Sequence, residues 1–109
     1  MNIELATAAL KALAHETRLR LFRTLVQAGP EGVCVADLAK QLATEANGSL
    51  SFHLKELSNA GLIQRRQVSR FIYYSANYPE MNALLGYLTE HCCAGAACSP
   101  TLPHCPPTP

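Results

Sequence analysis

The sequence predicts a mainly α-helical domain with one small β-hairpin. Three observations support this fold class. Apolar residues recur at the three- and four-residue spacing of amphipathic helices in four segments before residue 61. A stretch rich in β-forming residues follows, and a further helical pattern comes after it. The chain has 109 residues, of which 49% are hydrophobic, so we expect one domain with a real core.

The first four helices are expected at residues 3–13, 16–27, 35–42 and 48–60. The faces that we expect to be buried are, in chain order, Ile3, Leu5, Ala8, Ala9 and Leu13; Leu19, Phe22, Leu25 and Val26; Val35, Leu38 and Leu42; and Leu50, Leu54 and Leu57. Asn47 is a good N-cap for the fourth helix, and Gly61 is well placed to end it.

A hairpin and a fifth helix are expected to complete the fold. Residues 62–66 and 70–75 read as two strands around Gln67-Val68-Ser69. The segment 77–80 has proline near the first helical position and an acid in the first turn, which is typical of a helix start. The fifth helix carries one apolar stripe, formed by Met81, Leu84, Leu85 and Leu88. The order αααα-ββ-α is that of a winged helix-turn-helix.

This order suits DNA binding. Between residues 46 and 79 there are four basic side chains and one acidic one, although the formal net charge of the whole chain is only +1. A recognition helix places its N-terminal residues against base edges in the major groove, and basic hairpin residues neutralise backbone phosphates. We therefore expect double-stranded DNA to be contacted by Asn47, Ser49, Ser51, Phe52, His53 and Lys55 of the fourth helix and by Arg65, Arg66 and Arg70 of the hairpin.

The cysteines are concentrated at the C-terminal end. Four of the five lie in the last eighteen residues, at positions 92, 93, 98 and 105. Thiolates are soft ligands that select thiophilic ions. No apolar stretch has the length of a membrane span, and no secretory signal is visible, so we expect a cytoplasmic protein whose thiols stay reduced. We divide the chain into a DNA-binding and dimerisation domain, 1–91, and a cysteine-bearing, proline-rich effector-binding tail, 92–109.

Three motifs resemble the ArsR/SmtB family of metal-responsive repressors. The stretch 12–22 is similar to the LAHPTRLRIL signature, 51–63 to the S-x-H-L-x-x-L…G-L-[IV] recognition helix, and 65–74 to the R-x-G-R-x-x-x-Y hairpin. The resemblance covers roughly residues 5–90. It implies a homodimer that binds its operator without the effector and leaves it with the effector. The first and last helices would form the dimer interface, here through Leu5, Met81, Leu84, Leu85 and Leu88.

The sequence departs from the family pattern at both of the family's better-known ion sites. Members that sense soft metals on the third helix carry C-V-C-x-x-C, whereas this chain keeps only Cys34 and has Ala36 and Ala39 at the other two positions. The zinc pattern of the last helix is absent from residues 81–90. The effector site should therefore have moved to the C-terminal cysteines. Some arsenic-sensing members are similar to this chain in having a vicinal cysteine pair and a third cysteine just past the last helix.

As(III) and Sb(III) favour three thiolates, which Cys92, Cys93 and Cys98 would supply. Adjacent residues on a helix diverge by about 100°, so the helix must end or unwind there, which Gly95 would allow. Cys105 would replace Cys98, add a fourth ligand or do nothing. We also expect Cys92 to continue the apolar stripe of the fifth helix, so that an inducer ion pulls on the dimer interface.

Several alternatives stay open. Zinc or cadmium would take a fourth ligand from Cys105, His91 or His104, and a methylated arsenite would need only Cys92 and Cys93. A thiol-redox sensor would oxidise the pair instead, and a cysteine-tailed metal carrier would not bind DNA. Cys34 is expected to be buried or semi-buried, and His15 and His53 to be hydrogen-bonded rather than metal ligands. No organic cofactor and no enzymatic activity are expected, because a catalytic cysteine needs a rigidly held base.

Overall fold

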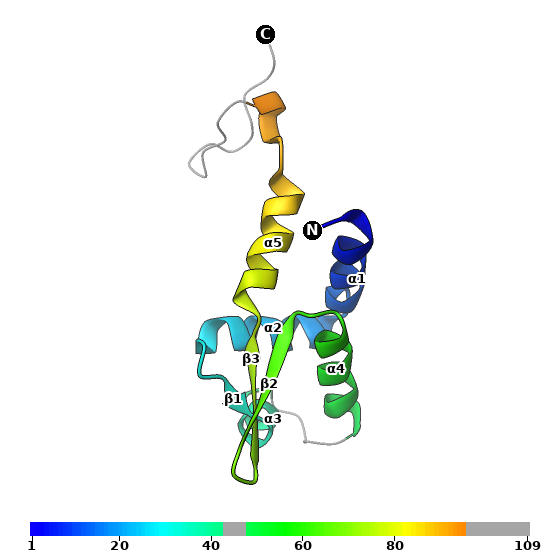
Figure 1. Cartoon of the computed structure of the whole chain (residues 1–109). Coiled ribbons are helices and arrows are strands. Elements are labelled where there is room, and N and C mark those ends of the chain that lie inside the picture. The colour runs from blue at the N-terminus through cyan, green and yellow to red at the C-terminus, as the bar shows by residue number, and fades with distance from the viewer. Residues whose placement is uncertain (43–47, 96–109) are drawn as a thin grey trace.

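The computed structural model describes residues 1–42 and 48–95. Within these ranges it has five α-helices, three short strands and one 3-10 turn (Figure 1). Their bounds are α1 Ile3–Leu13, α2 Glu16–Ala28, β1 Val33–Cys34, α3 Val35–Gln41, α4 Gly48–Asn59, β2 Ile63–Val68, β3 Phe71–Ala76, α5 Tyr78–Thr89 and η1 Cys92–Gly95. The predicted winged helix-turn-helix order is thereby confirmed, with β1 as an additional strand.

The strands form one antiparallel sheet in the order β1-β3-β2. Strand β1 pairs Val33 with Tyr74 and Cys34 with Tyr73; two residues are too few to give an alternating pattern, so sequence analysis missed it. The hairpin turn was also placed wrongly. Strand β2 runs two residues further than expected and β3 begins one residue later, so Ser69 and Arg70 form the turn, and Ser69 adopts a left-handed φ of 58°.

The core confirms the predicted face of α4 and corrects that of α1. Leu50, Leu54 and Leu57 are at most 2% exposed. On α1 the buried residues are the small ones, Ala6, Ala9 and Ala12; of the expected face, Ala9 is buried and Leu13 packs against the core. The other expected residues, Ile3, Leu5 and Ala8, are exposed, as is Leu10. Alanine faces let helices approach closely, and they leave the larger apolar side chains on the outer side. On α2 the buried residues are Leu21, Phe22 and Leu25, while Leu19 is exposed.

The α5 helix begins as predicted but ends sooner. The Asn77 side chain accepts a hydrogen bond from the Glu80 amide at 3.3 Å and donates one to the Gly61 carbonyl at 2.9 Å, which fixes the start of α5 beside the end of α4. The helix ends at Thr89, with Glu90 as C-cap.

Among the described helices, none has the length and apolar character that a membrane span requires.

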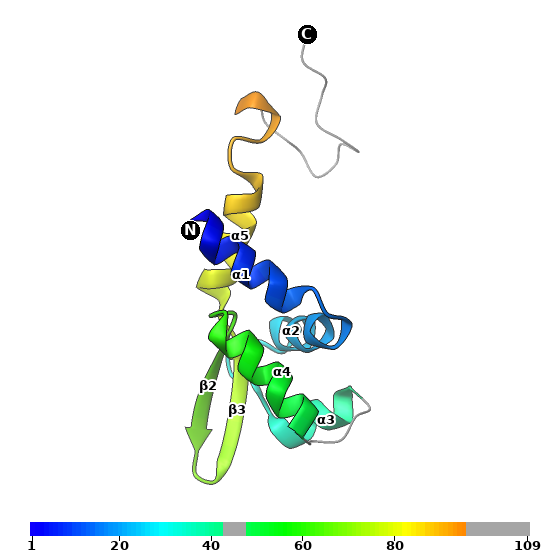
Figure 2. The same ribbon diagram turned by 90° about the vertical axis from the view of Figure 1, so that its right-hand side faces the viewer.

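The two ends of the molecule differ in what they present. Figures 1 and 2 show α1 and α5 on one side of α2, and the β2–β3 hairpin, α3 and the N-terminal end of α4 toward the other. The predicted apolar stripe of α5 is divided between two environments. Leu84 is buried and Met81 packs against the core, while Leu85 and Leu88 are 53% and 54% exposed.

Candidate nucleic-acid interface and cysteine cluster

The recognition helix α4 presents polar side chains because its leucines anchor the opposite face. With Leu54 and its neighbours in the core, Ser49, Ser51 and Lys55 are left exposed, and the Phe52 ring is 52% exposed. These four predicted DNA contacts are therefore accessible to a groove. Asn47, the predicted N-cap, lies outside the described residues.

His53 is held against α2. The Nε–H of Arg18 donates a hydrogen bond to Nδ1 of His53 at 3.2 Å, and the ring of His15 lies 4.6 Å from that of His53, centroid to centroid. Burial, then the charges of His15 and Arg18, lower the pKa of His53, against a smaller raising effect of Glu56. His15 accepts from the Thr17 amide, so both histidines are hydrogen-bonded, as predicted.

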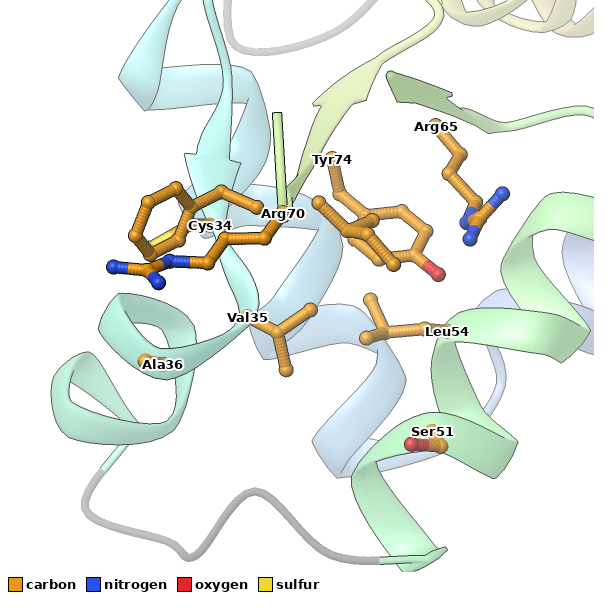
Figure 3. Close-up of a pocket in the computed structure, with 10 residues that line it drawn as sticks. Cys34, Val35, Ala36, Ser51, Leu54, Arg65, Arg70 and Tyr74 are labelled. Carbon is orange, nitrogen blue, oxygen red and sulfur yellow. The ribbon is translucent and has the colours of Figure 1, made fainter. Parts of the chain in front are cut away.

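Two of the three wing arginines line one cavity, and the third lies on the other face of the sheet. Arg65 and Arg70 line a cavity of about 440 Å³ between α3, α4 and the sheet, together with Ser51 and Tyr74. Figure 3 shows Arg65 on the α4 side of this cavity and Arg70 on the α3 side. Neighbouring residues of a strand point to opposite faces, and Arg66 accordingly lies on the other face, where it donates to the Glu31 carbonyl at 2.7 Å. Two basic side chains thus accompany the exposed face of α4.

The third-helix position of the family site holds one thiol. Cys34 is half-buried, as predicted, and lines the same cavity beside Ala36 (Figure 3). Among residues 1–42 and 48–95, no three histidine, cysteine or acidic side chains are grouped so that they would hold a metal ion. The described part of the third helix therefore offers no ligand set of its own.

The vicinal cysteines lie where the backbone leaves the helical conformation. After Thr89, His91, Cys93 and Ala94 have left-handed φ values of 60°, 59° and 52°, a conformation that costs non-glycine residues about 1–2 kcal/mol each. The expectation that Cys92 continues the α5 stripe is therefore wrong. The unwound backbone instead places the Sγ atoms of Cys92 and Cys93 3.2 Å from each other.

The burial and oxidation state of the cysteines decide which of them can bind an ion. Both Cys92 and Cys93 are half-buried. Cys93 is disulfide-bonded in this structure, so it would have to be reduced before it could bind an ion. Cys98 and Cys105, the predicted third and spare ligands, lie outside the described residues.

Sequence analysis missed three residues that organise this region. Arg18 joins α2 to α4, and Glu31 and Tyr73 hold Arg66. Arg18 lies within the 12–22 motif, so the sequence marked its position as notable. Nothing in the sequence indicated that its side chain would bind His53. Glu31 acts through its backbone carbonyl, which leaves no trace in the residue type.

Comparisons with known proteins agree with this geometry. Residues 13–66 match a family model described as a helix-turn-helix domain. The arsenical resistance operon repressor of Bacillus subtilis is 39% identical over 83 residues, which are 76% of this chain and 74% of that protein. The solved structure of NolR from Sinorhizobium fredii is 33% identical, with a TM-score of 0.63 over 86% of this chain and 88% of that one. An ArsR-like transcriptional regulator from Rhodococcus sp. RHA1, 24% identical, has the same fold, with a TM-score of 0.68 over 84% and 82% of the two chains.

Proposed function

Because the chain belongs to the ArsR family of transcriptional regulators, we propose that it represses transcription by binding operator DNA as a homodimer. We further propose that As(III) or Sb(III), bound by Cys92, Cys93 and Cys98, releases it. The observation that carries the ion proposal is the 3.2 Å separation of two sulfurs at the unwound end of α5.

The proposed DNA contact follows from two exposed sets of side chains at one end of the molecule. Ser51 and Lys55 are exposed on α4, and Arg65 and Arg70 approach from the wing. The arginines neutralise phosphates, which gives affinity to any sequence, and the polar residues of α4 read base edges. His53 contributes by holding α4 against α2 through Arg18.

The proposed homodimer is supported by an exposed apolar surface. Ile3, Leu5 and Leu10 of α1 and Leu85 and Leu88 of α5 each expose 42% to 61% of their surface. We call these five residues the apolar surface of α1 and α5. A set of large apolar side chains on so small a domain favours a partner, and a two-fold dimer matches a palindromic operator.

The chemistry of the vicinal pair supports a pyramidal, thiophilic ion. With ion–sulfur bonds of about 2.3 Å, two thiolates at right angles about one ion lie about 3.3 Å apart, and at a tetrahedral angle about 3.8 Å apart. The observed 3.2 Å is nearer to the first value. A reduced pair with this spacing would supply two ligands, and Cys98 would supply the third.

The effect of ion binding on DNA affinity would be transmitted through α5. The cysteines begin three residues after the helix ends, and Leu85 and Leu88 of the apolar surface lie on its last two turns. An ion that fixes the backbone there would change how α5 packs in the dimer, and with it the spacing of the two recognition helices. Coupling between two sites is typically about 1–3 kcal/mol, or about 5–150-fold in DNA affinity.

Fluorescence anisotropy with labelled operator DNA tests both halves of the proposal. The reduced protein is titrated onto DNA at several salt concentrations, and the complex is then titrated with arsenite, antimonite, methylarsenite, zinc, cadmium or peroxide. We expect arsenite and antimonite to release the DNA. Cys92→Ser, Cys93→Ser and Cys98→Ser should each bind DNA normally and stay bound when arsenite is added.

Cys34→Ser is the matched control, because it removes a half-buried thiol outside the cluster, and it should respond as the wild type does. If Cys34→Ser abolished the response and Cys92→Ser kept it, the effector site would have to be sought on α3. Release by methylarsenite with Cys98→Ser unaffected would favour a two-thiolate site. Release by peroxide alone would favour a redox sensor.

A further inference from the structure

Arg66 lies across the full width of the small sheet. It pairs with Tyr73 in the β2–β3 register, and its guanidinium lies 5.3 Å from the centre of the Tyr73 ring. Tyr73 in turn pairs with Cys34 of β1. The Nη2 atom of Arg66 reaches past β3 to the Glu31 carbonyl, 2.7 Å away, in the loop before β1. The side chain therefore begins on β2, packs over β3 and ends at the loop that precedes β1.

The loop is shaped to present that carbonyl. Gly32, which follows Glu31, has a φ of +85°, and a Cβ atom placed there would lie 2.4 Å from the Tyr74 carbonyl oxygen. The loop backbone thus lies directly against β3. Arg66 and Tyr73 also line one shallow cavity with Glu31 and Gly32. The acceptor of Arg66 is a backbone atom held by a conformation that only glycine adopts without strain.

Strand β1 has few backbone contacts with the wing, although its Val33 side chain is buried in the core. It is two residues long and shares only two register pairs with β3. It continues directly into α3, the first helix of the helix-turn-helix. Any contact that joins β2 to the β1 loop therefore couples the angle of the wing to the recognition unit.

We propose that Arg66 is a positioning residue that locks the wing onto the helix-turn-helix, and that Arg65, its neighbour on β2, is the phosphate-binding residue of the pair. The assignment replaces our sequence-based expectation that both contact DNA. Its consequence for DNA affinity rests on the proposed function, whereas the contact itself is a property of the free protein. The opposite faces of the two side chains carry the argument: Arg65 faces the α4 cavity, and Arg66 faces Glu31.

Two measurements on Arg66→Ala, Arg66→Lys and Arg65→Ala separate the roles. Hydrogen exchange of the free protein reports whether β1 stays paired, and the slope of log affinity against log salt counts phosphate contacts. Arg66→Ala should speed exchange of the β1 amides about tenfold and weaken DNA binding about tenfold, as the loss of one charge-assisted hydrogen bond would, with the salt slope unchanged. Arg65→Ala should leave exchange unchanged and lower the slope by about one.

Arg66→Lys tests whether Arg66 acts through its positive charge or through the geometry of its guanidinium group. Lysine keeps the positive charge but has neither the flat face that lies over Tyr73 nor the fork that reaches Glu31, so it should behave like Arg66→Ala. The proposal is overturned if Arg66→Ala lowers the salt slope by about one with β1 exchange unchanged and Arg66→Lys restores wild-type affinity. If the wild type bound no DNA, the proposed function would fail, and the exchange data alone would still decide whether Arg66 holds β1.

Discussion

The dimer proposal makes the most quantitative prediction, for Leu88→Glu on α5. Leu88 is 54% exposed, so a partner would bury about half of its surface. Full burial of a leucine is worth about 1.5–3 kcal/mol, so half is worth about 1 kcal/mol, and two-fold symmetry counts it twice. Placing two carboxylates in the interface adds several kcal/mol. At about 1.4 kcal/mol per factor of ten, we expect the dimer dissociation constant to rise more than about a thousandfold.

Sedimentation equilibrium at micromolar concentration measures this directly. The wild type should be a dimer, Leu88→Glu a monomer, and Leu88→Ala, which loses only the apolar contribution, an intermediate case weakened about thirtyfold. Val68→Glu is the matched control, because Val68 is also an exposed apolar residue, 44%, but lies in the hairpin, away from α5 (Figure 1). A monomeric wild type, or equal effects of Leu88→Glu and Val68→Glu, would refute the reasoning.

Three further predictions concern the scaffold. Gly32→Ala should lower the melting temperature and speed β1 exchange, because the new Cβ meets the Tyr74 carbonyl; unchanged values in a thermal melt would contradict this. Tyr78→Phe should cost about 1 kcal/mol in urea unfolding, since the hydroxyl donates to the carbonyls at the end of α2, and an unchanged midpoint would argue against that bond. The pKa of His53 is lowered in the folded protein, so neutral His53 contributes stability above pH 6.5, and this contribution is lost as the pH falls through the lower pKa of the folded state. His53→Gln should therefore make the free energy of unfolding depend less on pH below 6.5. An unaltered pH profile would exclude the effect.

Much of the fold could be predicted because the signals are local. Leucines at helical spacing placed α4 and its buried face, the turn residues 77–80 placed the start of α5, and the run of β-formers placed the hairpin. The candidate ion ligands were likewise visible, since four cysteines in eighteen residues are a compositional fact. The polar start of α4 and the arginines of the hairpin pointed to DNA for the same reason.

Other features depended on which surfaces meet in space. Helical spacing placed both Ala9 and Leu5 on the buried face of α1, but Leu5 is exposed, because closely packed helices favour small side chains over large ones at the contact. The sequence does not say that α5 stops at Thr89, since no proline or glycine follows directly.

The tertiary structure alone decided where the wing arginines lie. Arg65 and Arg66 are the same residue type in adjacent positions, and only the pleat of β2, with α4 on one face and the Glu31 carbonyl on the other, separates them. The sequence by itself determined the kind of protein, the helix-turn-helix order and the residue types available for DNA and for a soft ion. Which side chains are free to use that chemistry was settled by long-range packing, because a contact between residues 31 and 66 leaves no periodicity in the chain.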